Sequence, residues 1–130
     1  GAEPIPVARV ATPADILEAR RYVMQLYMDE RVLDYIVDIV MATRSPGSAG
    51  LPDLAPLIEF GASPRASIAL AQAARAHAFL RGRDYVTPED VKAMAPDVLR
   101  HRIITSYEAE AEGVSSDDIV RRVLGAVRAP

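Results

Sequence analysis

Apolar residues recur three or four positions apart along much of this chain, with polar residues between them, as expected for helices that bury one face. Two N-terminal stretches, residues 12–27 and 30–43, follow this pattern. Their apolar positions are Ile16, Leu17, Val23, Met24 and Tyr27, followed by Val32, Leu33, Ile36, Ile39 and Val40. Arg20 falls within the first apolar stripe, where it either reaches past the stripe to solvent or faces a partner.

A third helix is predicted from about Pro64 to Leu80, and it is apolar around most of its circumference. A helix of this kind belongs at the centre of a domain, and its many alanines permit neighbouring helices to approach closely. His77 lies amid its apolar positions, and we favour a hydrogen-bonded core histidine over a catalytic one there.

Capping residues predict where the helices begin. Segments 12–15 and 87–90 each combine a threonine cap, a proline at the first helical position and an acid three residues after the cap. Asp29 is the predicted cap of the second helix, and Ser115 or Ser116 that of a last helix. Pro96 is expected to interrupt the fourth helix. The last helix has the apolar positions Ile119, Val120, Val123, Leu124 and Val127.

The remaining segments lack this periodicity. Residues 1–11 hold two prolines and are predicted to be a linker, and residues 45–60 are predicted to be loop-like because glycine and proline break their regularity. Ile103 and Ile104 can extend beside Tyr85 and Val86. The predicted fold class is therefore all-α, a small bundle of five to six helices with one short two-stranded β pairing as an option.

Composition narrows the functional classes. The chain has 130 residues, half of them apolar, which suits one compact domain. Its apolar runs are far shorter than the roughly 18 residues of a membrane span, and no signal peptide pattern is visible. The lack of cysteine excludes disulfides and thiolate metal sites, no metal site is predicted, and the cytoplasm is the default compartment. A net charge of −3 with scattered basic residues argues against duplex binding.

The start of the third helix carries an unusual charge. Ser63 is a good cap and Pro64 suits the first helical position, so Arg65 falls in the first turn, where a cation opposes the helix dipole. An arginine there is explained if an anion binds both the guanidinium and the helix start. The alternative is an exposed arginine without a ligand.

Five short segments stand in a specific order and spacing. They are Tyr35-Ile36-Val37, Ala42-Thr43-Arg44, Gly61-Ala62-Ser63-Pro64-Arg65, residues 82–91, and Val98-Leu99-Arg100-His101-Arg102. In this arrangement the chain resembles, from about Val10 to its end, the C-terminal helical lid of the MoxR family of AAA+ ATPases.

This resemblance implies that residues 12–130 are the lid and that residues 1–11 lead from an N-terminal ATPase core outside this chain. The sequence contains no G-x-x-x-x-G-K-[ST] phosphate loop and no strand followed by paired carboxylates. ATP and Mg²⁺ are therefore expected to bind mainly to that core. The intact protein is expected to hydrolyse ATP, and the 130-residue chain alone is not.

The resemblance also implies roles for particular residues. Arg65 corresponds to the lid arginine called sensor 2, which contacts the γ-phosphate of ATP in the same or a neighbouring subunit. Ser63 and Pro64 position it by fixing the start of the helix. Tyr35 and Ile36 are candidates to border the adenine, and the open alternative is that both are core residues.

A basic cluster of Arg100, His101 and Arg102 is predicted to contact a core domain or a neighbouring subunit. The alternatives are a nucleotide, nucleic acid or a solvated face. By resemblance, the intact protein forms a homo-oligomeric ring, a hexamer, that matures partner complexes like a chaperone. Proteins with von Willebrand A-type domains are expected partners, and methanol dehydrogenase activation named the family. The rival functions are a stand-alone helical interaction module and, less favoured, a DNA-binding helical domain.

Overall fold

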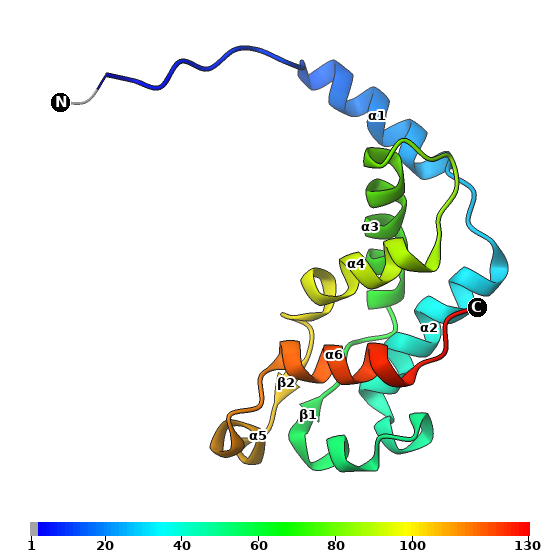
Figure 1. Ribbon diagram of the computed structural model, residues 1–130, viewed down its shortest axis with the longest axis vertical. Coiled ribbons are helices and arrows are strands. Elements are labelled where there is room, and N and C mark those ends of the chain that lie inside the picture. Colours follow the sequence, from blue (N-terminus) through cyan, green and yellow to red (C-terminus); the bar gives the residue numbers. More distant parts are fainter. Residues whose placement is uncertain (1–2) are drawn as a thin grey trace.

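The computed structural model describes residues 3–130, which fold into α-helices packed around one core (Figure 1). The helices and strands, in chain order, are α1 (Pro13–Gln25), α2 (Glu30–Arg44), the 3-10 helices η1 (Pro46–Ala49) and η2 (Pro52–Leu57), β1 (Ile58–Phe60), α3 (Ala66–Leu80), α4 (Pro88–Leu99), β2 (Ile104–Thr105), α5 (Tyr107–Glu112) and α6 (Ser116–Ala126). The predicted all-α bundle with one short β pairing is confirmed.

The predicted caps form. Thr12 and Asp15 make a capping box, in which the Thr12 hydroxyl accepts the Asp15 N–H at 3.2 Å and the Asp15 carboxylate accepts the Thr12 N–H at 2.8 Å. The Asp29 carboxylate accepts the backbone N–H of Arg31 at 2.9 Å. Ser115, rather than Ser116, caps α6. Each cap satisfies an N–H that the first helical turn leaves without a partner.

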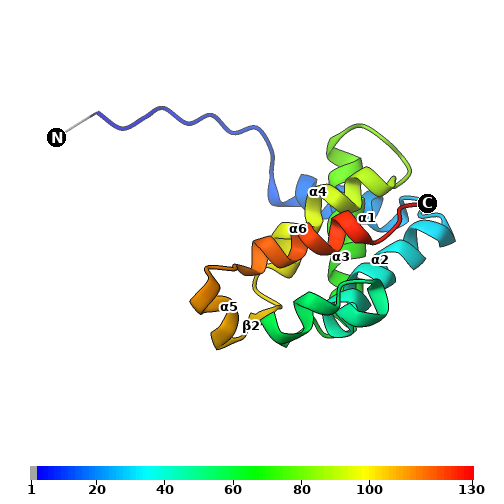
Figure 2. The same ribbon diagram turned by 60° about the horizontal axis from the view of Figure 1, so that its bottom comes forward.

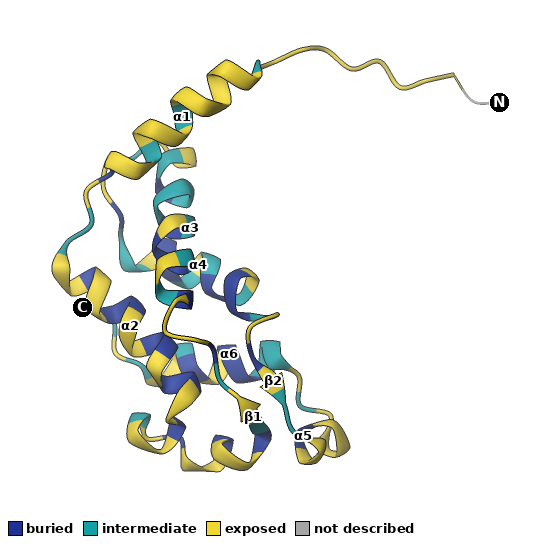
Figure 3. Cartoon of the chain, turned by 180° about the vertical axis from the view of Figure 1, so that it is seen from behind, coloured by how far each residue is buried: buried dark blue, intermediate teal, exposed yellow. Residues whose placement is uncertain are grey.

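The core is built around α3, which packs against α4, α2 and α1. Leu70, Ala74 and Ala78 of α3 are fully buried, and the small alanines let the neighbouring helices approach closely. The apolar faces of α2 and α6 close the same core (Figure 3). The prediction of a central third helix is thus confirmed.

Helix α1 has no buried residue, although its apolar stripe has helical spacing. Ile16, Leu17 and Met24 expose 59%, 54% and 74% of their surface. The helix lies at one end of the molecule and packs mainly on α3, and the extended residues before it run away from the body (Figures 1 and 2). Its apolar stripe is therefore available to a partner.

The β pairing differs from the predicted one. Ile104 of β2 pairs with Phe60 of β1 in an antiparallel arrangement, and not with Tyr85 and Val86. The segment around Tyr85 is already paired with the α1–α2 junction, since the Val86 N–H donates to the Tyr27 carbonyl at 2.9 Å. The loop-like segment 45–60 instead forms η1, η2 and β1, which places β1 beside β2.

Pro96 does not interrupt α4. The helix runs without a break from Pro88 to Leu99, and Pro96 lies inside it. The Pro96 carbonyl still accepts the Arg100 N–H at 2.9 Å, so the helical bonding continues on its C-terminal side. The prediction of an interruption was wrong because one missing N–H and a local clash can be absorbed by a helix that is well packed on both sides.

Candidate functional site: the Arg65 turn

Arg65 lies in a tight turn between β1 and α3. Successive backbone bonds run from the N–H of Ala66 to the carbonyl of Ser63 at 2.8 Å and from the N–H of Ser67 to the carbonyl of Pro64 at 3.1 Å. The Ser63 hydroxyl accepts the N–H of Arg65 at 3.0 Å. Ser63 therefore caps this turn and not α3, because α3 begins at Ala66 with Arg65 at its N-cap position. The predicted helix start, with Ser63 as cap and Pro64 as first residue, is thus displaced by two residues.

The Arg65 side chain is exposed, and within residues 3–130 its guanidinium forms no ion pair. It lines an open hollow of about 510 Å³. The other residues around this hollow are Phe60, Gly61, Ser63, Ala66, Ile68, Ala69, Gln72, Arg102 and Ile104. No carboxylate of the described chain lines it, so Arg65, Arg102 and the start of α3 border the hollow without a negative partner. This arrangement suits an anion.

The Arg65 turn is attached to the end of α2. The Thr43 hydroxyl, fully buried, accepts the N–H of Ala62 at 3.0 Å and donates to the carbonyl of Val40 at 2.7 Å. Nη1 of Arg44 donates to the carbonyl of Ala62 at 3.2 Å. Both backbone polar groups of Ala62 are thus bonded to side chains of two consecutive α2 residues.

Gly61 lies against the backbone of that same end of α2. A Cβ atom added to Gly61 would lie 2.3 Å from the carbonyl oxygen of Thr43 and 2.8 Å from the Cα of Arg44. No side chain fits there, because neither contact is with a flexible group. Two of the sequence segments quoted above, 42–44 and 61–65, therefore contact each other directly, which their separation in the sequence does not reveal.

Tyr35 and Ile36 lie in the core of the domain, with 2% and 0% of their surface exposed. This is the second of the two interpretations that the sequence left open. Burial raises the pKa of the Tyr35 phenol, with a further contribution from Glu89, and its hydroxyl has no hydrogen-bond partner among residues 3–130. With so little surface exposed, both side chains contribute to the packing of the domain core.

The Arg100–Arg102 cluster is divided between two places. Arg100 pairs with Asp117 of α6, its Nε lying 2.8 Å from one carboxylate oxygen, and with Asp97 at 3.1 Å. Arg102 donates to the carbonyl of Val98 and lines the hollow beside Arg65. His101 is exposed. Only Arg102 of the three thus shares a surface with Arg65.

A buried carboxylate network fixes the segment before α4. The sequence indicated the contact of Asp90 with Thr87 and a hydrogen-bonded His77, but not that Arg83, His77 and Thr87 share one carboxylate. Asp90 is fully buried, and both of its oxygens lie 2.6 Å from guanidinium nitrogens of Arg83. Nδ1 of His77 lies 2.6 Å from the same carboxylate, and the Thr87 N–H donates to it at 2.8 Å. Burial acts to raise the pKa of Asp90, but the hydrogen bonds from Arg83, Thr87 and His77 lower it further and hold it well below its usual range.

Comparison with known proteins agrees with this architecture. Residues 53–123 match the family described as the AAA lid domain. The whole chain aligns with Chaperone MoxR1 from Mycobacterium tuberculosis at 39% identity and covers 34% of that protein. Protein MoxR from Methylorubrum extorquens aligns with 74% of the chain at 40% identity, over 29% of its own length. A crystal structure from Cytophaga hutchinsonii, of a protein proposed to be an ATPase, superposes with a TM-score of 0.86 and 45% identity over 90% of this chain and 36% of that one.

The chain belongs to the AAA lid domain family, and it is the lid of a MoxR-family AAA+ ATPase. It spans about a third of the length of the curated relatives it matches. No helix in the described part of the chain is long and apolar enough to cross a membrane. Within residues 3–130, no three acidic, histidine or cysteine side chains gather as a metal site would require.

Proposed function

We propose that Arg65 is the sensor 2 arginine of this lid and that it contacts the γ-phosphate of an ATP bound to an ATPase core outside the described chain. The observation that carries this proposal is the exposed Arg65 at the start of α3, which lines a hollow without carboxylates and forms no ion pair with another described residue. A guanidinium offers a planar fork of donors to phosphate oxygens and keeps its charge at every physiological pH.

The same geometry explains how hydrolysis would move the lid. While the γ-phosphate is in place, its charge holds Arg65 and therefore the whole lid against the nucleotide. Loss of the γ-phosphate removes most of this attraction, and the lid is then free to rotate. ATP shifts the lid towards the nucleotide-bound position because it binds more tightly to the protein in that position than in the rotated one.

The core of the same polypeptide would supply the phosphate loop and the ligands of Mg²⁺, which this sequence lacks. The exposed apolar stripe of α1 and residues 3–11 offer a surface for that core or for a neighbouring subunit of a homo-oligomeric ring. One relative is named a chaperone, and in line with that name the ring proposed for this protein would act on partner proteins. The partner proteins that we propose include proteins with von Willebrand A-type domains.

The proposal is tested by ATP turnover of the full-length ATPase with Arg65→Ala. We expect kcat to fall on the order of 100-fold, the size of effect seen when one preorganised donor to a developing charge is removed. Arg81→Ala is the matched control, because Arg81 is also an exposed arginine at an end of α3, the end opposite the hollow. Turnover that is unchanged in Arg65→Ala would favour the rival function, a helical module that only contacts proteins.

A further inference from the structure

The structure assigns a positioning role to Thr43 and Arg44: we infer that these two residues at the end of α2 hold the Arg65 turn in place, so that α2 and Arg65 move as one body. This inference rests on the proposed function of Arg65. A capped helix start alone would make the position of Arg65 depend on α3 only. With Thr43 and Arg44 bonded to Ala62, the position of Arg65 depends on α2 as well.

The Thr43 hydroxyl is the only group of the described chain that bonds the buried N–H of Ala62. It donates its own proton to the Val40 carbonyl, which turns its lone pairs towards Ala62. Valine has the same shape but can make neither bond, whereas serine can make both. The position therefore needs a hydroxyl rather than a particular volume.

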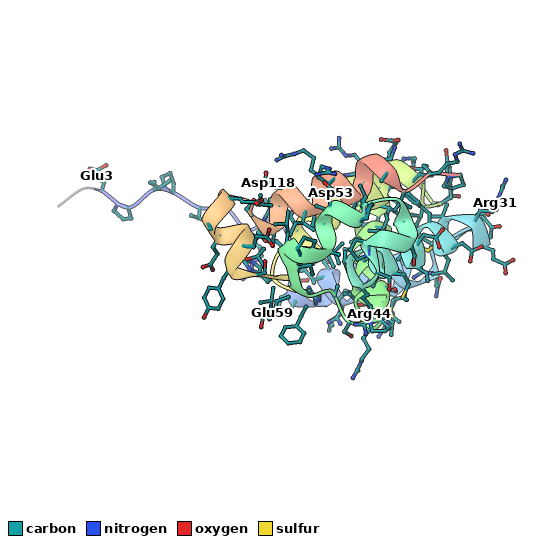
Figure 4. All side chains as sticks on the ribbon, turned by 90° about the horizontal axis from the view of Figure 1, so that it is seen from below. Glu3, Arg31, Arg44, Asp53, Glu59 and Asp118 are labelled. Atoms are coloured by element: carbon teal, nitrogen blue, oxygen red, sulfur yellow. The ribbon has the colours of Figure 1, made fainter. Side chains whose placement is uncertain are left out.

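Arg44 bonds the other side of the same residue, through the Ala62 carbonyl. Its side chain is exposed, and Figure 4 shows it at the same edge of the molecule as Glu59 of β1. Because the Arg44 side chain lies at the surface, its substitution removes the bond to the Ala62 carbonyl but no buried side chain. The bond from Thr43 is buried and the bond from Arg44 is partly buried, and each can be removed without the other.

Gly61 lets the Arg65 turn lie directly against the end of α2. With no Cβ on Gly61, its backbone rests on the last turn of α2. Ala62 is three residues before Arg65, and the turn between them is closed by the bond from the Arg65 N–H to the Ser63 hydroxyl. A shift of Ala62 is therefore passed to Arg65 with little chain in between to absorb it.

The consequence for catalysis follows from how steeply rates depend on placement. A misplacement of about 1 Å by a residue away from the chemistry can cost on the order of 100-fold in rate. We expect Thr43→Val in the full-length ATPase to lower kcat roughly ten-fold with a KM for ATP within about two-fold of the original, because the nucleotide itself is held by the core. Thr43→Ser should retain most of the activity, and Arg44→Ala should lower kcat by roughly three-fold.

The experiment is a double-mutant cycle on ATP turnover by the full-length ATPase. Thr43→Val and Arg44→Ala are each measured with Arg65 present and in the Arg65→Ala background, with Thr43→Ser and Arg81→Ala as controls. If Thr43 and Arg44 act through Arg65, both lose their effect on kcat once Arg65 is absent. An equal fall in both backgrounds would show general destabilisation and overturn the inference.

Other outcomes are also decisive. Normal turnover in Thr43→Val and Arg44→Ala, with reduced turnover in Arg65→Ala, would overturn this inference and leave the proposed function standing. Normal turnover in Arg65→Ala itself would overturn the proposed function and the inference with it. If Thr43→Val does not fold, Arg44→Ala carries the cycle alone, since its side chain lies at the surface; loss of its effect without Arg65 supports the inference, and an unchanged effect overturns it.

Discussion

Asp90 and Arg83 form a two-point ion pair in which a fully buried carboxylate meets a partly exposed guanidinium, with both nitrogen–oxygen distances at 2.6 Å. The pair closes the segment between α3 and α4, and that segment is bonded in turn to the α1–α2 junction at Tyr27. The Asp90 carboxylate thus stabilises the segment to which the α1–α2 junction is bonded.

Removal of this carboxylate should destabilise the fold. Asp90→Asn leaves Arg83 and His77 without their charged partner, and breaking a buried pair from one side costs about 3 kcal/mol. The free energy of unfolding of the 130-residue chain, measured by urea titration at neutral pH, should fall by about that amount. Asp84→Asn, at an exposed aspartate of the same segment, is the control and should change it by less than about 0.5 kcal/mol.

The same carboxylate predicts a dependence on pH. Its pKa is lower in the folded chain than the ordinary value of 3.8, so the stability it provides is present above that value and is lost as the pH falls towards the folded pKa. The difference in unfolding free energy between the original chain and Asp90→Asn should therefore narrow as the pH is lowered below 3.8. A difference that stays constant across this range would contradict the account.

The Thr43 hydroxyl should contribute to stability in a way that its volume does not explain. Thr43→Val leaves the buried N–H of Ala62 without a partner, which costs about 1–3 kcal/mol. Thr43→Ser keeps both hydrogen bonds and loses only a methyl group, so it should cost about 1 kcal/mol. Thermal unfolding of the 130-residue chain distinguishes the two, and equal stabilities of Thr43→Val and the original chain would show that the hydroxyl is dispensable.

Gly61 should tolerate no side chain. Gly61→Ala places a Cβ 2.3 Å from the Thr43 carbonyl oxygen, and this oxygen belongs to the backbone of α2, so α2 and the turn must separate. We expect a loss of about 2–3 kcal/mol, in the range of overpacked cores. Gly47→Ala is the matched control, because a Cβ there has no neighbour within 4 Å. Equal stability of the two variants would contradict the close approach of Gly61 to α2.

The local features of this fold could be predicted from the sequence, because they depend on residues three or four positions apart. The caps at Thr12, Asp29 and Thr87 and the central position of α3 are of this kind. The contact of Thr43 with Ala62 and the pairing of Phe60 with Ile104 join residues 19 and 44 positions apart, and no short pattern reports such contacts. The place of Arg65 at a helix start predicted that its side chain is exposed. Nothing in the sequence predicted that its turn is attached to α2.

The role of Asp90 shows the same limit. Its spacing from Thr87 predicted a capping box, which forms, but nothing in that spacing predicted its bonds to Arg83 and His77. The sequence could not show whether Tyr35 and Ile36 face a ligand or the core, because a buried apolar stripe and a ligand-facing one have the same period. Only the packing of α2 against its neighbours distinguishes the two.

The proposed role of Arg65 depends on the distance between its guanidinium and the γ-phosphate of bound ATP. It is measured most directly in a structure of the full-length ATPase assembled with a nonhydrolysable ATP analogue and Mg²⁺. We expect a guanidinium nitrogen of Arg65 to lie about 2.7–3.2 Å from a γ-phosphate oxygen, in its own subunit or a neighbouring one. An Arg65 side chain that lies away from every nucleotide in that assembly would overturn its assignment as sensor 2.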